Sequence, residues 1–253
     1  MTAASPVAEF WSLDQRIGRL HFGPVTAQID LSRPHLGLHA IRLASTPLDA
    51  RLLALLPSDS DTWPAGLVDA YIRSQDLIAT YAAVDTWPYA PQIYWGVDPA
   101  NNGSGVVASL SLVVSIQTHL LDTQPRIEVR SRLCAEELLL VRVTGDDLLV
   151  DSHVTGEQQI EPWSSSCGLV WRLAGGTMSY AEIMPTSDFR RLAIEHDPGG
   201  EIQSRWELFA EFLEKGVIRR ARMQSIFLPR ENDVQLAAEF CQAIERRPLP
   251  LTT

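Results

Sequence analysis

Residues 126–133, RIEVRSRL, alternate between charged side chains and side chains that are apolar or small. Successive side chains of a β-strand point to opposite faces of a sheet, so this period of two predicts a strand with one buried face. Its other face, rich in arginine, is expected to meet water, which is typical of antiparallel sheets. The segment therefore favours an all-β protein built from antiparallel strands.

The same period of two continues through most of the chain. In residues 106–119 one face is apolar, whereas the opposite face carries Ser111, Gln117 and His119. A strand of this length would span about 45 Å, which suits a large sandwich better than a small barrel. Glycine, proline and other turn residues separate further alternating segments and predict hairpins. The clearest of these segments are 16–22, 25–31, 36–43, 67–73, 76–82, 169–173, 177–184, 190–196 and 201–209.

One helix is predicted, at residues 232–247. Asn232 can cap its first turn, apolar residues follow at helical spacing, and Pro248 ends it. Residues 205–213 fit either a helical or an extended period, and the surrounding hairpins favour a strand. Because the sequence contains no repeat, linker or low-complexity tract, we expect one β-sandwich domain spanning residues 1–253.

The net charge of −10 restricts the partners of the chain. An acidic protein is repelled by phosphate backbones and by anionic lipid, so neither nucleic acid nor a membrane is expected as a partner. The apolar run 105–121 is interrupted by polar residues and does not predict a membrane span. The N-terminus lacks the pattern of a signal peptide and the three cysteines lie far apart, so we expect a soluble cytoplasmic protein.

The sequence contains no P-loop, no dinucleotide-binding glycine motif and no nucleophile elbow, and no cofactor is predicted. His35 and His39 are near neighbours, but only Asp30 lies close enough in sequence to add a third ligand. We interpret both histidines as polar residues around a turn and predict no metal site.

Residues 86–95, TWPYAPQIYW, gather two Trp, two Tyr and two Pro. The prolines exclude the first half from a central strand, whereas the second half alternates and places Trp95 beside Ile93 on a core face. Trp87 and Tyr89, in the proline-stiffened part, are the better candidates for exposure and for ligand binding. Three interpretations stay open for these rings: core packing, a platform for a sugar, or a surface for a partner.

Two further groups of residues can carry acid–base chemistry. Glu182 lies between Tyr180 and Met184 on one strand face, and apolar neighbours would raise the pKa of its carboxyl group. Arg190 follows in the loop beyond this strand. The alternative is a solvated glutamate beside an ordinary turn.

The second group lies on the polar face of the long strand. Gln117 and His119 project from it, and Arg73 flanks the turn of another hairpin. If the sheet is concave on this side, these residues and Glu182 would share one pocket. His119 and Glu182 are then the candidate catalytic pair, and Arg73, Gln117, Tyr180 and Arg190 are candidate ligand-binding residues together with Trp87 and Tyr89.

The long antiparallel strands and the charged sheet face, with RIEVRSRL following SLVVSIQTHLLDTQP, resemble the β-supersandwich of galactose-mutarotase-like proteins over roughly residues 15–230. The resemblance is closer to bacterial members without an assigned reaction than to any named enzyme. It implies a protein that binds a carbohydrate or a protein partner through a polar concave sheet face. The alternative that it implies is a sugar-processing epimerase or lyase that uses a Glu/His pair.

Overall fold

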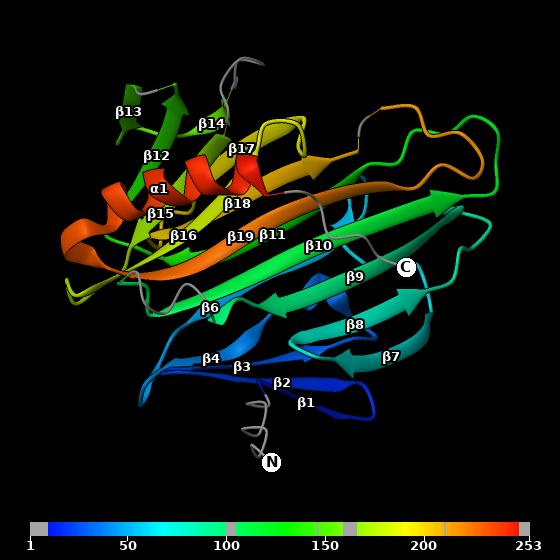
Figure 1. Cartoon of the computed structure of the whole chain (residues 1–253), viewed down its shortest axis with the longest axis horizontal. Coiled ribbons are helices and arrows are strands. Elements are labelled where there is room, and N and C mark those ends of the chain that lie inside the picture. Colours follow the sequence, from blue (N-terminus) through cyan, green and yellow to red (C-terminus); the bar gives the residue numbers. More distant parts are fainter. Residues whose placement is uncertain (1–9, 100–104, 146, 159–165, 210, 248–253) are drawn as a thin grey trace, which may run out of the picture.

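The protein folds into three antiparallel β-sheets and one α-helix (Figure 1). The computed structural model describes residues 10–99, 105–145, 147–158, 166–209 and 211–247. Within them the strands outnumber all other elements, which confirms the predicted all-β class with a single helix near the C-terminus.

The largest sheet has the strand order β13-β12-β15-β16-β19-β10-β9-β8-β7. Its strands, in that order, are Asp147–Asp151, Glu137–Thr144, Ser166–Arg172, Met178–Pro185, Arg219–Pro229, Ala108–Thr118, Tyr89–Val97, Asp76–Tyr81 and Leu67–Arg73. The predicted long strand is β10, and the predicted hairpin around the turn at 74–75 joins β7 to β8.

Two smaller sheets complete the sandwich. The second sheet has the order β14-β17-β18-β11-β6, with strands Gly156–Gln158, Arg191–His196, Glu201–Leu208, Ile127–Cys134 and Ala50–Pro57. The third runs β1-β2-β3-β4-β5, with strands Trp11–Asp14, Ile17–Phe22, Val25–Asp30, His39–Leu43 and Thr46–Pro47. One continuous apolar core joins the inner faces of all three sheets.

The alternation of residues 126–133 is confirmed in β11. Ile127, Val129 and Leu133 are fully buried in the core, whereas the arginines lie on the other face. Residues 205–208 belong to β18, which confirms the first part of the strand predicted for 205–213. Phe209 and residues 211–213 lie outside the named strands, so the rest of that prediction is wrong.

Residues 36–43 depart from the predicted strand. Pro34–Leu36 form a 3₁₀ turn, and β4 begins only at His39. Gly37 between them has a φ of 62°, and a Cβ atom there would lie 2.5 Å from the carbonyl oxygen of Leu52. The close approach of β6 therefore requires glycine and interrupts the strand.

The helix α1, Asp233–Arg246, lies across the outer face of the largest sheet over β12, β15 and β16 (Figure 1). It follows the 3₁₀ turn Arg230–Asn232. Asn232 occupies the N-cap position as predicted, but its side chain makes no capping bond. The helix is tied down instead by Asp233, whose carboxylate accepts bonds from Arg172 Nε at 2.9 Å and Ser179 Oγ at 2.7 Å.

The contribution of Asp233 to stability is expected to depend on pH. Burial alone would raise the pKa of this carboxyl group, but hydrogen bonds from Arg172 and Ser179 lower it below its usual value. A lowered folded-state pKa stabilises the protein above the unfolded value of about 3.9, and this stabilisation is lost as the pH falls through the folded-state pKa.

Asp233→Asn should therefore cost about 2 kcal/mol at pH 7, since Arg172 keeps Glu137 as a second partner at 2.8 Å. The cost should begin to shrink near the unfolded-state pKa of about 3.9 and vanish as the pH falls through the lower folded-state pKa, where Asp233 of the folded protein becomes protonated. Urea unfolding of both proteins between pH 2 and pH 7 measures this difference. A cost that stays constant across that range would contradict the role given to the Asp233 charge.

Two structural findings bear on membranes and metals. Among the described residues, no helix is long and apolar enough to cross a membrane. Within the same part of the chain, no group of three or more His, Cys, Asp and Glu side chains is placed to hold a metal ion. His35 Nδ1 lies 3.4 Å from the backbone nitrogen of Trp63, and His39 Nδ1 lies 3.1 Å from the carbonyl oxygen of Gly37.

Candidate functional site

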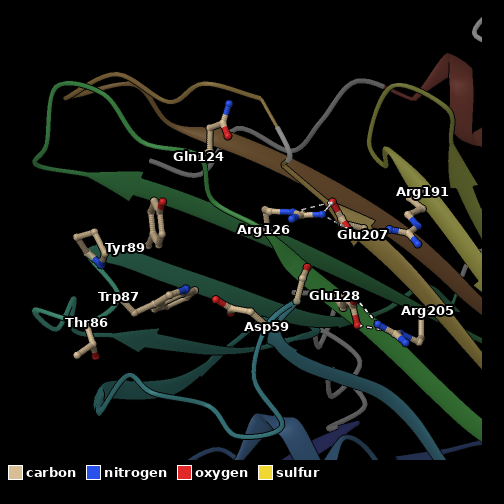
Figure 2. A pocket seen from close by; sticks show the side chains of 12 residues that line it. Asp59, Thr86, Trp87, Tyr89, Gln124, Arg126, Glu128, Arg191, Arg205 and Glu207 are labelled. Carbon is tan, nitrogen blue, oxygen red and sulfur yellow. Dashed lines mark hydrogen bonds and ion pairs between the residues drawn. The ribbon is translucent and has the colours of Figure 1, made fainter.

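A polar cavity of about 320 Å³ lies over the outer face of the second sheet (Figure 2). Strands β11, β17 and β18 supply its charged floor, and the segment that leads into β9 supplies an aromatic wall. We call this cavity the Trp87 pocket. Its lining residues are Ser58, Asp59, Thr86, Trp87, Pro88, Tyr89, Gln124, Arg126, Glu128, Arg191, Arg205 and Glu207.

Cross-strand register explains the arrangement of the floor. Glu128 on β11 lies directly opposite Glu207 on β18, and Arg130 lies directly opposite Arg205. Like charges in direct register repel, so the side chains pair diagonally instead. Glu207 accepts two bonds from Arg126 Nη2, at 2.9 and 3.0 Å.

Glu128 is held by one arginine of its own strand and by one diagonal partner on β18. It accepts bonds from Arg130 Nε at 2.7 Å and from Arg205 Nη2 at 3.0 Å. The Glu128 hydrogen bond is also the main cause that raises the pKa of Arg205. Because such charge-assisted bonds are directional, the floor presents donors and acceptors at fixed positions.

The aromatic wall consists of Trp87 and Tyr89, whose ring centroids lie 5.3 Å apart in edge-to-face contact. Behind the wall the edge-to-face contacts continue from Trp87 to Trp63 at 5.1 Å and from Trp63 to Tyr81 at 5.2 Å. The backbone nitrogen of Trp87 donates to the carbonyl oxygen of Val84 at 2.9 Å, and this turn folds the indole back onto Trp63.

Trp87 and Tyr89 are each only 7% exposed, so their predicted exposure at the surface is wrong. Both rings pack in the core and also border the Trp87 pocket. The other half of the segment behaves as predicted, because Trp95 shares the core with Ile93 and is 2% exposed. Tyr94 points to the opposite face of the sheet, where it packs with Ile78.

Glu182 lies in the interior between the largest sheet and the second sheet and is inaccessible to solvent. Its carboxylate accepts four hydrogen bonds. Tyr180 hydroxyl donates at 3.0 Å and Ser131 Oγ donates to the same oxygen, while Ser204 Oγ and Trp206 Nε1 each donate to the other at 2.9 Å. Burial raises the pKa of Glu182 although these donors oppose the rise. The sequence anticipated the raised pKa, but the residue faces the core and no open pocket.

His119 lies far from Glu182. Glu182 is in register with Ser225, and Ser225 with Leu110. His119 follows nine positions after Leu110, which corresponds to about 30 Å along an extended chain. The predicted catalytic pair is therefore not brought together, because a single sugar ring cannot bridge that distance.

The other predicted ligand-binding residues also scatter. Gln117 and His119 border a separate depression of about 310 Å³ together with Lys215. Arg73 is exposed at the β7–β8 turn, and the register of β8, β9 and β10 places this turn at the opposite end of the sheet from His119. Tyr180 is fully buried.

Arg190 is exposed in the loop before β17. Its backbone nitrogen donates to the carbonyl oxygen of Glu207 at 2.8 Å, but its side chain does not line the Trp87 pocket. Its neighbour Arg191 does line it, and pairs with Glu157 at 2.7 Å.

Of the predicted site residues, the Trp87 pocket contains only Trp87 and Tyr89. The charged residues of its floor were missed as site residues, although the alternation of 126–133 identified their face. That signal places Arg126 and Glu128 on one side of a strand, but it does not reveal which residues of a distant strand complete the site.

No protein-family model matches the chain, and no curated protein matches it. Several solved structures match the chain. An α-galactosidase of family GH36 from Geobacillus stearothermophilus, in complex with raffinose, matches at a TM-score of 0.48 and 9% identity, over 84% of this chain and 40% of that one. A proposed aldose 1-epimerase from Escherichia coli K12 matches at 0.47 and 10% identity, over 83% and 97%.

A proposed aldose 1-epimerase from Klebsiella pneumoniae superposes better, with a TM-score of 0.54 at 9% identity, over 90% of this chain and 83% of that one. An identity this low carries information on the fold alone. The chain thus has the galactose-mutarotase-like β-sandwich fold that its strand pattern predicted.

Proposed function

We propose that this protein binds a carbohydrate in the Trp87 pocket. The observation that carries the proposal is the pairing of an aromatic wall with a floor of guanidinium and carboxylate groups fixed in diagonal ion pairs. Sugars present patches of C–H groups beside rings of hydroxyls, so they are recognised by flat aromatic rings next to fixed polar groups.

The charge balance of the pocket favours a neutral ligand. Asp59, Glu128 and Glu207 offset the three arginines that line it. A strongly anionic ligand would have to compete with carboxylates that already hold Arg126 and Arg205. Hydroxyl groups can both donate to the carboxylates and accept from the guanidinium groups without breaking these pairs.

A second cavity of about 200 Å³ adjoins the first and supports a ligand longer than one sugar ring. The two cavities share Glu128, Arg191, Arg205 and Glu207 along their common border. Together they form a groove that crosses β11, β18 and β17 toward β14. An oligosaccharide could lie along this groove with one ring against Trp87 and Tyr89.

The fold neighbour from Klebsiella pneumoniae agrees with this ligand class, because its name assigns it an aldose as substrate. This support is by analogy of fold. Glu182 is buried in the core and His119 lies at the far end of β10, so these two side chains cannot act as an acid–base pair on one sugar ring.

Arg191→Gln is expected to weaken oligosaccharide binding about tenfold, because it removes a charged hydrogen-bond donor from the border of both cavities. Arg191 is half-exposed, so the protein should fold normally without it. Arg230→Gln is the matched control, because Arg230 pairs with Glu136 at 2.8 Å away from the pocket.

Isothermal titration calorimetry with neutral mono-, di- and tetrasaccharides of glucose and galactose measures the effect. Affinity should rise from the monosaccharides to the tetrasaccharides, and Arg230→Gln should bind like the wild type. The proposal fails if none of these sugars binds, or if both arginine variants bind as the wild type does.

A further inference from the structure

We propose that β7 is a dimerisation edge, through which two copies of this chain join their largest sheets into one continuous sheet. β7 is the last strand of that sheet, and in the part of the chain that the structure describes it pairs only with β8. Most of its side chains are exposed, including Tyr71 at 37% and Ile72 at 39%. An exposed edge strand offers unpaired backbone groups to another strand.

A β-bulge limits the part of β7 that can pair. The register with β8 shifts between Leu67 and Asp69, and is regular from Asp69 to Arg73. Bulges disrupt ladder pairing locally and protect edges from extended association. The regular segment DAYIR is therefore the part of the edge open to a second strand.

This segment is complementary to itself when two copies run antiparallel about a twofold axis at Tyr71. Asp69 then lies opposite Arg73 of the second copy, and Arg73 lies opposite Asp69 of the second copy. Ala70 lies opposite Ile72 in the same way, and the two Tyr71 rings meet at the axis. Opposite charges, apolar pairs and aromatic pairs are the cross-strand combinations that stabilise sheets.

The pairing also extends the layers of each monomer. Ala70 and Ile72 are in register with Ala79 and Leu77, which belong to the core face of β8. Ile72 would thus meet an apolar side chain of the second copy along the rim of the existing core. Tyr71 is in register with Ile78, on the outer face.

β13, at the opposite edge of the sheet, is apolar in its middle and has an aspartate at each end. In β13, DLLVD, Leu148, Leu149 and Val150 are exposed, so apolar character alone would favour this edge for association. An antiparallel pair about Leu149 would place Asp147 opposite Asp151 of the second copy at both ends. This repulsion disfavours self-pairing at β13 and leaves β7 as the edge for a closed dimer.

Charge reversal tests the proposed register. Wild type should be a dimer that dissociates on dilution in sedimentation equilibrium. Arg73→Asp places two aspartate pairs in register, and Asp69→Arg places two arginine pairs, so each variant should raise the dimer dissociation constant at least about tenfold. Both positions are exposed, and circular dichroism should show that each variant keeps the wild-type fold.

An equimolar mixture of the two variants should recover the dimer, because every charged pair is then of opposite sign. The double variant Asp69→Arg/Arg73→Asp should dimerise by itself for the same reason. Leu149→Asp, at an exposed position of β13, is the control: it adds to the acidic charge of that edge and should leave the dimer unchanged. A monomeric wild type at millimolar concentration, single variants that dimerise like the wild type, or a mixture that stays monomeric would each overturn the proposal.

Discussion

Glu182→Ala is expected to lower the free energy of unfolding by about 5 kcal/mol, a large share of the stability of an ordinary domain. The carboxylate accepts bonds from Tyr180 on its own strand, and from Ser131 on β11 and Ser204 and Trp206 on β18, which belong to the second sheet. Alanine removes every acceptor and leaves a cavity at the centre of the sandwich, so buried donors lose their partners.

Glu182→Gln separates the loss of acceptors from the loss of volume. The serine and tyrosine hydroxyls can rotate and accept a bond from the new amide, whereas Trp206 Nε1–H can only donate. If the amide nitrogen faces Trp206, one buried donor loses its partner, and if it faces the other way the hydroxyls must rearrange. The expected cost is about 2 kcal/mol.

Urea unfolding at pH 7 measures both costs. Glu195→Gln is a matched control, because this side chain is 54% exposed and pairs with Arg205 at the surface. Surface pairs of this kind contribute less than about 1 kcal/mol. A cost below about 1 kcal/mol for Glu182→Ala would show that this carboxylate does not hold the two sheets together.

Trp95→Ala is expected to cost about 3–5 kcal/mol, as large truncations in cores do. Trp95 is in register with Leu77 on β8 and Leu112 on β10, both fully buried. Its indole nitrogen makes no hydrogen bond, so the loss comes from packing and from the cavity.

Trp87→Ala should cost less, about 2 kcal/mol, because its ring borders the Trp87 pocket and water can fill part of the space. Thermal unfolding of both variants gives the comparison, and Trp95→Phe should recover part of the loss. Equal and small costs at the two positions would remove Trp95 from the core and contradict the register of β9.

The strands were predictable because the alternation of apolar and polar residues along each strand identifies its buried face and its exposed face. Alternation identified β10, β11 and the β7–β8 hairpin, and helical spacing identified α1. The same local rule placed Trp95 in the core. It could not tell whether the face that carries Glu182 meets solvent or a second sheet, since this depends on how the sheets stack.

The Trp87 pocket lies beyond local rules for a related reason. Arg126 and Glu207 are 81 positions apart in the sequence and meet only through the pairing of β11 with β18. The alternation shows charged residues on the outer face, but the diagonal pairing follows from like charges in direct register. The prediction that Trp87 is exposed was wrong because its proline neighbours suggested a surface loop. A tight turn instead packs the Trp87 ring against Trp63.

A crystal structure of this protein with the tightest-binding oligosaccharide of the calorimetric series would show where the sugar binds. We expect a sugar ring against Trp87 and Tyr89, with hydroxyl groups bonded to Arg126, Glu207 or Arg191 and the oligosaccharide extending toward β14. A sugar seated instead in the depression beside Gln117 and His119, with the Trp87 pocket filled only by water, would contradict the proposed binding site.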